Sequence, residues 1–426
     1  MRILLLSQFY PPVIGGEERH VRNLALALAA RGHEVSVATQ AGREASGMTM
    51  DGAVRVWRIR GTAQRASALF SDGDRPFAPP FPDPELVLGL RRVVTSENPD
   101  IVHAHNWLLH SYLPLRLHSH TPLIVTLHDY SLLCARKNFL YMGRSVCSGP
   151  GVRKCLACAG QQYGVAKGSI TTFANWVGAS RERRAVNMFL AVSAAVARIN
   201  RLAERGVPFE VLPNFVPDSI ADLNCAPDPR LAELPAAYML YVGDLSVQKG
   251  VHLLLDAYRQ TGTMVPLVMI GRRFPDFPAT VPQGVQVFEP WPHSVVMQAW
   301  QRCLFGLAPS IWHEPCATVV IEAMALCKAM VVSDLGGMPD LVQDMETGLV
   351  VTPTVEALAA AMRRLLDDTA FRDRLGARAA AQVGRFQEHA VVPRIETIYR
   401  ALVMQHAPTP RPPESTFVNR QGSHVQ

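Results

Sequence analysis

The chain has 426 residues, of which 48% are hydrophobic and 18% are charged, and its formal net charge is +6. This length predicts two domains, and the apolar content is enough for two large cores. No apolar run is long enough for a membrane-spanning helix, and no recognised nucleic-acid motif or basic stripe occurs, so we expect neither an integral membrane protein nor a nucleic-acid-binding protein.

The charge is unevenly divided along the chain. Residues 1–216 hold 25 basic and 15 acidic side chains, whereas the remainder holds 17 and 21. A basic half can contact an anionic membrane surface or an acidic substrate, although a solvated surface explains it equally well. The N-terminal segment MRILLLSQFYPP predicts a first strand rather than a signal peptide, because prolines follow the short apolar run at once. We therefore expect a cytoplasmic protein that can associate with a membrane.

The first half alternates apolar runs with helical patterns. Residues 2–6 form a continuous apolar run, as in a strand buried on both faces, and residues 17–32 show a helical periodicity that ends at Gly32. Further predicted strands are 34–39, 54–59, 100–105, 123–128, 189–193 and 209–214. This alternation predicts a doubly wound parallel sheet over residues 1–216.

A segment rich in Pro, Asp and Asn, residues 217–235, interrupts this pattern and is the predicted linker. A second alternating run follows, with predicted strands at 238–244, 267–271, 285–288, 304–310, 329–334 and 348–351, and with amphipathic helices at 357–368, 371–383 and 391–403. We expect a second α/β domain over 236–385 and a disordered, Pro-rich tail over 407–426. Two such domains place their ligand crevices at the carboxyl ends of their strands, across a cleft.

Two loops that follow strands carry glycines next to helix starts. Gly15 and Gly16 open a helix after the first strand, where backbone amides can approach an anionic ligand closely. Gly243 ends a strand in the second domain, and Lys249 lies just before the next helix, where its ammonium group can reach a phosphate. A tight turn explains either loop alone. The GxGxxG pattern is absent, which disfavours an NAD-dependent dehydrogenase.

The segment EPCATVVIE places two carboxylates around the start of a predicted helix. Eight positions are a little over two helical turns, so Glu314 and Glu322 fall roughly on one side. The helix N-terminus between them offers an anion site. Its amides are those of Ala317, Thr318 and Val319. Acceptors for hydroxyl groups on both sides of a phosphate cradle suit a sugar nucleotide. A capping carboxylate with a surface glutamate is the alternative, but the apolar neighbours of Glu322 disfavour it.

Four motifs occur together: GG at 15–16, VGDLSVQKG at 242–250, EPCATVVIE at 314–322 and SDLGGMPDLV at 333–342. As a set they resemble the retaining glycosyltransferases of family 4, over about residues 1–405. The resemblance implies the GT-B fold, in which two Rossmann-like doubly wound domains face each other across a cleft and a C-terminal helix, here 386–406, crosses back to the first domain. It implies hexosyl transfer from a UDP-, GDP-, ADP- or TDP-sugar to a glycan, a lipid-linked glycan or a small molecule, as in polysaccharide biosynthesis.

The resemblance also assigns roles to residues. Glu314 matches the first glutamate of the E-x7-E motif, which contacts the transferred sugar, and Glu322 matches the second, which holds the donor ribose. Lys249 matches the lysine on the donor diphosphate. The glycine pair 15–16 matches the loop near donor and acceptor, and His128 matches a histidine beside the reacting centre. In such enzymes the leaving diphosphate is thought to help accept the acceptor's proton, so we expect no cofactor for catalysis.

One position departs from the family pattern. The family places an arginine directly after the strand glycine, where it clamps the diphosphate with the lysine, and this chain has Asp244 there. A carboxylate would repel a diphosphate. Either Asp244 points away and Arg272 or Arg273 supplies the charge, or donor binding is weak. Ala317 replaces a glycine that many members have, and its amide is still a donor.

Four of the eight cysteines cluster in an insertion at about 134–158, shortly after His128. Cys134, Cys147, Cys155 and Cys158 have the spacing C-x12-C-x7-C-x2-C, which ends in a close pair, as in structural zinc sites. A cytoplasmic location disfavours disulfides, and free thiols are the other alternative. We expect a structural zinc ion here, and the insertion resembles one in some members of the family.

Two other functions stay open. A sugar-nucleotide epimerase with the same fold would bind the donor without transfer to an acceptor, and a non-catalytic subunit, which Asp244 favours, would bind the donor without turnover. His103 and His105 are expected to bond to backbone groups near a strand end. The segment 171–186, with mixed apolar and basic residues, is expected to line a groove or contact a membrane.

Overall fold

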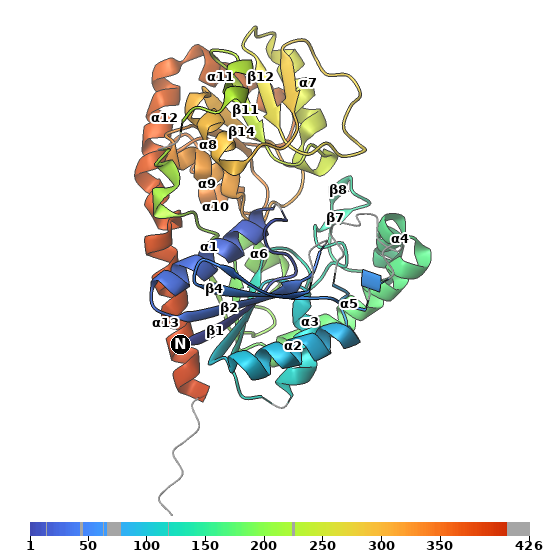
Figure 1. The fold of residues 1–426 in the computed structure, drawn as a ribbon. Coiled ribbons are helices and arrows are strands. Elements are labelled where there is room, and N and C mark those ends of the chain that lie inside the picture. Colours follow the sequence, from blue (N-terminus) through green and yellow to red (C-terminus); the bar gives the residue numbers. More distant parts are fainter. Residues whose placement is uncertain are drawn as a thin grey trace, which may run out of the picture.

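The computed structural model describes residues 1–13, 15–42, 46–62, 64–65, 78–117, 119–223 and 226–406. The chain forms two α/β lobes, and the last two helices, α12 (Thr369–Gln382) and α13 (Glu388–His406), lie one after the other along the C-terminal and the N-terminal lobe (Figure 1). The predicted tail lies outside the described residues. Within the described ranges, no helix combines the length and the apolar character needed to cross a membrane.

The N-terminal lobe is built on an eight-stranded sheet in the order β10-β9-β6-β5-β1-β2-β4-β3. Its strands are β1 (Arg2–Leu6), β2 (Glu34–Gln40), β3 (Gly47–Asp51), β4 (Val54–Ile59), β5 (Ile101–Ala104), β6 (Leu123–Leu127), β9 (Met188–Ala191) and β10 (Phe209–Val211). All neighbours pair in parallel except β3, which is antiparallel to β4. The sequence pattern did not predict β3, because this edge strand is largely exposed and lacks a continuous apolar run.

The strands of this sheet are buried on both faces. Alternate residues of β1 belong to different cores: Ile3 and Leu5 pack with α1, whereas Leu4 and Leu6 pack with α2 and α3. The helices of the lobe are α1 (Gly16–Ala30), α2 (Pro84–Glu97), α3 (Leu108–Arg116), α4 (Val152–Tyr163), α5 (Val165–Ala185) and α6 (Ala194–Ile199). The predicted doubly wound architecture is confirmed.

The C-terminal lobe has a six-stranded, all-parallel sheet in the order β13-β12-β11-β14-β15-β16. Its strands are β11 (Met239–Val242), β12 (Leu267–Ile270), β13 (Val285–Phe288), β14 (Phe305–Ala308), β15 (Met330–Ser333) and β16 (Leu349–Val351). Its helices are α7 (Val251–Thr261), α8 (His293–Arg302), α9 (Thr318–Ala325), α10 (Met338–Leu341), α11 (Val355–Asp367) and α12 (Thr369–Gln382). Each strand coincides with a predicted apolar run.

The last helix, α13 (Glu388–His406), packs on the N-terminal lobe, as the GT-B resemblance implied. Val392, Ile395 and Tyr399 are buried in the same core as β1 and α1. The chain therefore passes between the lobes twice, and the two passages touch. The amide of Val216 donates to the carbonyl of Phe386 at 3.1 Å, and the amide of Glu388 donates to the carbonyl of Val216 at 3.0 Å.

The cysteine-containing insertion forms a side arm of the N-terminal lobe. It contains a small hairpin, β7 (Leu140–Tyr141) with β8 (Ser145–Val146), followed by α4 and α5, which pack against each other. In Figure 1 the hairpin points toward the C-terminal lobe. The side chain of Asn138 in this arm donates to Gln248 of the C-terminal lobe at 3.4 Å, so the arm borders the space between the lobes.

Candidate active site

The strand orders place ligand crevices beside β1 and beside β11, where the order reverses. In the C-terminal lobe, the loops after β11 and β14 carry Lys249 and Glu314 to this edge. Gly250 lets the two loops touch. Its φ is 76°, and a Cβ there would lie 1.8 Å from the carbonyl oxygen of Pro309, so only glycine fits without displacement.

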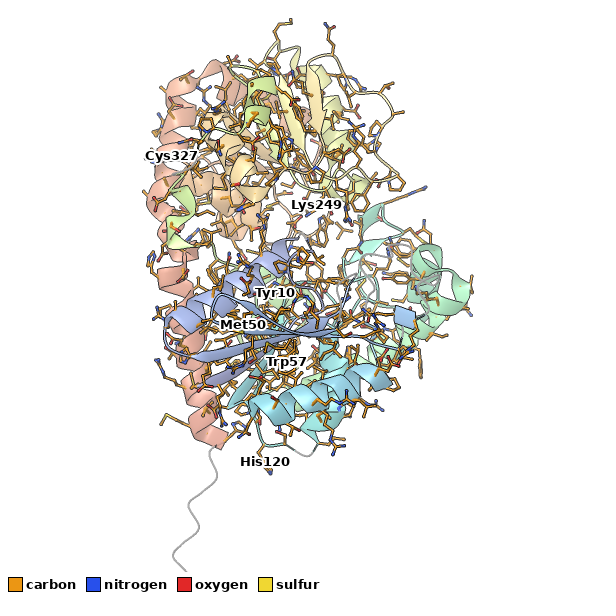
Figure 2. All side chains as sticks on the ribbon, in the orientation of Figure 1. Tyr10, Met50, Trp57, His120, Lys249 and Cys327 are labelled. Atoms are coloured by element: carbon orange, nitrogen blue, oxygen red, sulfur yellow. The ribbon has the colours of Figure 1, made fainter. Side chains whose placement is uncertain are left out.

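Four side-chain hydrogen bonds hold Glu314. Lys249 Nζ donates to Oε1 at 2.9 Å and to Oε2 at 2.7 Å. Oε2 also accepts from Ser310 Oγ at 3.1 Å and from Trp312 Nε1 at 3.0 Å. The carboxylate is buried, and the ammonium group of Lys249 balances its charge on the side of the lobe that faces the N-terminal lobe (Figure 2). The two residues predicted for the sugar and the diphosphate are therefore brought into direct contact.

Glu322 lies in α9 and is only 2% exposed, so the predicted buried position is confirmed. Its Oε1 accepts from Arg19 Nη1 at 3.2 Å and bonds to His293 Nε2 at 2.9 Å. Burial raises the pKa of this carboxyl, but the charge of Arg19 and the bond to His293 outweigh burial and lower it overall. Oε2 is buried with no hydrogen-bond partner among the described residues. Because an unpaired buried acceptor is costly, this oxygen is poised for a ligand hydroxyl.

The N-terminus of α9 lies between the two glutamates in the sequence. Ala317 is its N-cap residue, and among the described residues no side chain caps the helix. The first-turn amides of Thr318 and Val319 have no partner within the helix, as an anion site requires. The glycine loop of the other lobe reaches this turn: a Cβ on Gly16 would lie 3.6 Å from Thr318 Oγ1. The structure thus brings the predicted loop of Gly15 and Gly16 to the predicted anion site.

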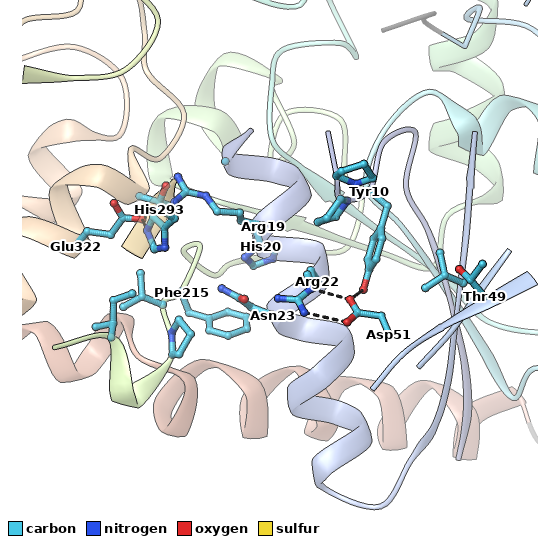
Figure 3. Close-up of a pocket in the computed structure, with 18 of the residues that line it drawn as sticks. Tyr10, Arg19, His20, Arg22, Asn23, Thr49, Asp51, Phe215, His293 and Glu322 are labelled. Atoms are coloured by element: carbon cyan, nitrogen blue, oxygen red, sulfur yellow. Dashed lines mark hydrogen bonds and ion pairs between the residues drawn. The ribbon is translucent and has the colours of Figure 1, made fainter. Parts of the chain in front are cut away.

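A cavity of about 590 Å³ opens between the lobes beside this helix. One end is lined by Glu322, Thr318 and His293 of the C-terminal lobe and by Arg19 of α1, as Figure 3 shows for the labelled residues. The other end is lined by a partly exposed polar group on the N-terminal lobe. There Arg22 donates to both oxygens of Asp51, at 2.6 and 2.9 Å, and Tyr10 donates to the same carboxylate at 2.9 Å.

Asp244 forms an ion pair with Arg272. Its Oδ2 lies 3.5 Å from Arg272 Nη2, and each side chain is about two fifths exposed. Arg273 pairs instead with Glu289, also at 3.5 Å. Each of the two arginines that were expected to replace the missing cation is thus engaged by a carboxylate. A role in donor binding for Gly243 and Arg272 stays a prediction.

Histidines dominate the facing edge of the N-terminal lobe. His128 Nε2 and His105 Nδ1 are 3.1 Å apart, within hydrogen-bond distance, and the ring of His20 packs edge-on against both. Burial lowers the pKa of all three, to about 4 for His20. They are therefore neutral imidazoles near pH 7. Their ligand atoms lie within 4.8 Å of one another, close enough to share a metal ion.

His103 and His105 do not have the expected backbone partners. His103 bonds to the hydroxyl of Tyr399 at 2.6 Å and to that of Thr126 at 2.7 Å, whereas His105 bonds to His128. The reason is that β5 is central in the sheet, so its side chains meet those of neighbouring elements. His20 was missed by sequence reasoning. Its only signal is that it is a polar residue on the apolar stripe of α1, four positions before Leu24.

Glu17 is a second residue that the sequence reasoning missed. It follows the glycine pair, and Asn106 Nδ2 donates to its Oε1 at 2.5 Å. Burial and the neighbouring Glu18 raise the pKa of Glu17 to about 8, against the charge of Lys137. A carboxyl group that keeps its proton near pH 7 can donate a hydrogen bond, which an ordinary glutamate cannot do.

The four clustered cysteines lie within the side arm and have free thiols. Burial raises the pKa of Cys134 to about 11, and the nearby thiols of Cys147 and Cys158 add to the shift. Cys158 Sγ accepts from the amide of Met142 at 3.2 Å. A zinc tetrahedron has sulfur atoms about 3.8 Å apart. In the described part of the chain, the group brought within 4.8 Å is that of the histidines rather than the cysteines, so zinc binding stays a prediction.

Each lobe matches a glycosyltransferase family model. Residues 14–219 match the model of Glycosyltransferase Family 4, and residues 229–382 match the model of glycosyl transferases group 1. The glycogen synthase of Mycobacterium tuberculosis strain H37Rv is 28% identical over 438 residues, which cover 97% of this chain and 98% of that protein.

Solved structures show the same fold. Sucrose-phosphate synthase from Thermosynechococcus elongatus superposes with a TM-score of 0.73 and 19% identity, over 95% of this chain and 99% of that one. Anabaena HepE in complex with UDP and glucose superposes with a TM-score of 0.66 and 18% identity, over 94% of this chain and 100% of that one. The predicted GT-B fold is confirmed.

Proposed function

We propose that this two-lobed glycosyltransferase, whose halves match the family 4 and group 1 models, moves a hexosyl group from a nucleoside-diphosphate sugar to an acceptor with retention of configuration. The observation that carries the proposal is the buried Glu322 Oε2 beside the start of α9, since the described residues provide neither a hydrogen-bond donor for this oxygen nor a side-chain cap for the helix. A ribose hydroxyl supplies the donor, and the diphosphate meets the free amides. Glu314, one loop away, then faces the transferred sugar.

The reaction that fits these groups needs positioning and charge more than a nucleophile. The bond between the anomeric carbon and the diphosphate oxygen breaks, and a bond to the acceptor oxygen forms on the same face of the sugar. The acceptor's proton passes to the departing phosphate oxygen. Lys249 and the α9 amides stabilise the negative charge that develops on the leaving group. We propose that this step requires no catalytic metal.

His128 is the proposed contact of the N-terminal lobe with the reacting sugar. Its Nε2 is held by His105, which fixes the orientation of the ring and leaves Nδ1 for a substrate hydroxyl. Because the low pKa keeps the imidazole neutral, it adds no positive charge beside the diphosphate. It therefore acts as a hydrogen-bonding group in this proposal.

The test is a calorimetric or thermal-shift screen of UDP-, GDP-, ADP- and TDP-sugars. The names of similar proteins, among them glycogen synthase and structures with UDP or ADP, put UDP- and ADP-glucose first. A donor that binds is then incubated with acceptors, and the anomeric configuration of the product is read by NMR. Binding to none of the donors contradicts the proposal. An epimerised donor, or binding without turnover across acceptors, would favour the epimerase or the non-catalytic subunit.

We propose that the acceptor is presented at a membrane surface, because α5 has an exposed apolar face on the basic N-terminal lobe. Ile170, Phe173 and Val177 are 61%, 68% and 38% exposed and follow helical spacing. Lys167 and Arg181 continue the same face, so it pairs apolar contact with attraction to anionic headgroups. Wild type should sediment with phosphatidylglycerol vesicles and much less with phosphatidylcholine, and Phe173→Ser should bind less. Equal sedimentation with both lipids would contradict membrane docking.

We also propose a structural zinc ion on Cys134, Cys147, Cys155 and Cys158, since four thiols in one arm are a suitable donor set. The ion would hold the hairpin of β7 and β8 against α4. Elemental analysis of gently purified protein should give about one zinc per chain, and Cys155→Ser should lose it. Well under one zinc per chain in wild type would contradict the site.

A further inference from the structure

Among the described residues, the two ion pairs of Lys249 and Arg272 on the proposed donor side of the C-terminal lobe carry no surplus positive charge. Lys249 is matched by Glu314 at 2.7 Å, and Arg272 is matched by Asp244 at 3.5 Å. A diphosphate brings about two negative charges to this place. Backbone amides at the start of α9 attract it, but Glu322 lies one turn further along and repels it. A further cation is therefore needed, and this lobe does not supply it from these pairs.

Arg19 reaches this place from the other lobe. It is on the first turns of α1, just after Gly16, which itself lies against Thr318 at the start of α9. Its Nη1 donates to Glu322 Oε1 at 3.2 Å, its side chain is 32% exposed, and it lines the same cavity as Thr318. Thr318 and Glu322 are one helical turn apart, a rise of about 6 Å. Figure 3 shows Arg19 extending toward Glu322. A guanidinium group on Glu322 is thus within range of an anion on the α9 amides.

We propose that Arg19 is the second cation of the donor diphosphate site, supplied by the N-terminal lobe. This inference rests on the proposed function and adds a residue that neither the sequence motifs nor the comparisons assign. With Arg19, the set Lys249, Arg19, Glu314 and Glu322 is neutral before the donor binds. Without it, the set carries one net negative charge. Arg19 therefore makes donor affinity depend on contact between the lobes.

A competing role for Arg19 has the opposite effect. Suppose that Arg19 only pairs with Glu322 in the empty enzyme. The donor ribose must then displace the Arg19 side chain, and removal of Arg19 should tighten donor binding. The geometry favours the first role, because Arg19 occupies Oε1 while Oε2 is left without a partner for the ribose. The ribose and Arg19 can then bind the same carboxylate together. The sign of the change in affinity separates the two roles.

The experiment is calorimetry of UDP and of ADP with wild type, Arg19→Gln and the control Arg92→Gln, which removes an equal charge from the exposed face of α2. Arg19→Gln should weaken the binding of whichever nucleotide binds wild type about 10- to 100-fold, and the control should change it less than about 2-fold. Unchanged or tighter binding in Arg19→Gln overturns the proposal. Failure of wild type to bind either nucleotide or any donor would instead count against the proposed function.

Two further variants separate charge from folding. Adding Asp244→Arg to Arg19→Gln restores a cation beside the diphosphate and should recover at least about 10-fold of the lost affinity, which a purely structural defect would not do. If Arg19→Gln does not fold because Glu322 is left buried without its partner, Glu322→Gln is compared with Arg19→Gln/Glu322→Gln. The double variant should bind the nucleotide about 10-fold more weakly. Equal affinity of these two variants overturns the proposal.

Discussion

Selected buried titratable groups on the two lobes differ in their charge state. On the C-terminal lobe, Glu314 and Glu322 are buried as ion pairs with Lys249 and Arg19. On the N-terminal lobe, His128 and Glu17 are neutral, whereas Arg22 and Asp51 form an ion pair with each other. The pKa of His128 is held well below its ordinary value by burial, and the pKa of Glu17 is raised to about 8, also mainly by burial.

This difference matches the two kinds of substrate. A diphosphate is recognised by charge, so its site keeps cations and fixes them with carboxylates. An acceptor hydroxyl is recognised by neutral donors and acceptors, since a full charge beside it would compete with the diphosphate for the cations. We therefore expect donor affinity to depend strongly on charge, and acceptor affinity to depend on hydrogen-bond geometry.

The largest expected effect comes from the charged face. Lys249→Ala should lower kcat/KM about 1,000-fold and Glu314→Gln about 100-fold, because each removes stabilisation of the leaving group or of the transferred sugar. Initial rates with the donor found in the screen measure this. Arg92→Ala, on the exposed face of α2, is the control. Near-normal rates in either site variant would contradict the assignment of this face to the donor.

A smaller effect is expected on the neutral face. His128→Ala should lower kcat/KM about 10- to 100-fold, because it removes one oriented hydrogen-bonding group. Since burial holds the pKa of His128 well below its ordinary value, its protonation should not shape the activity of wild type between pH 6 and 8. A step near pH 6.5 in the pH profile of wild-type kcat/KM that disappears in His128→Ala would show that the ring takes up a proton there. This result would contradict the neutral state of His128.

The raised pKa of Glu17 can be tested through the pH dependence of the unfolding free energy. The unfolded carboxyl loses its proton near its ordinary pKa, and the folded one loses it at about 8. Between these values the folded state binds more protons, so this group makes wild type less stable as pH rises from about 5 to 8. Glu17→Gln stays neutral and should gain stability relative to wild type over this range, as measured by urea unfolding at pH 5 and pH 8. Glu233→Gln, at an exposed position, is the control. A constant difference between Glu17→Gln and wild type would contradict the raised pKa.

The smallest effect concerns the support behind the histidines. Tyr399→Phe removes the bond from α13 to His103 and should cost about 1 to 3 kcal/mol of unfolding free energy, because a buried imidazole nitrogen loses its partner. Activity should stay within about 2-fold, since neither residue is proposed to touch the substrate. Urea unfolding and initial rates measure the two quantities. A large loss of activity with unchanged stability would place this pair in the site itself.

The sequence predicted most of the fold because parallel strands buried on both faces appear as continuous apolar runs. Where burial is one-sided or absent, the signal is lost, as for the edge strand β3 and the short hairpin of β7 and β8. The two glutamates and Lys249 were identified because their motifs are local. Glu322 lies in α9 itself, and Glu314 and Lys249 lie only a few residues from the strands and helices that position them.

The partners of these residues were not predictable in the same way. Arg19 and His293 meet Glu322 from a different lobe and a different helix, and no spacing in the chain records such contacts. The neutral state of Glu17 and of the histidines is a property of burial, which the letters of the sequence do not carry. Sequence therefore predicted the charged groups of the proposed donor site, whereas the structure showed what balances each charge.

The contact between Val216 and the residues just before α13 has a mechanical consequence. Both passages of the chain between the lobes run through this contact. It can therefore act as a single hinge about which the lobes rotate. Such a rotation would change distances at the outer rims of the lobes most and distances close to Val216 least. Entry of substrate and closure of the site would then be the same movement, and spin labels on the outer rims of the two lobes would report it directly.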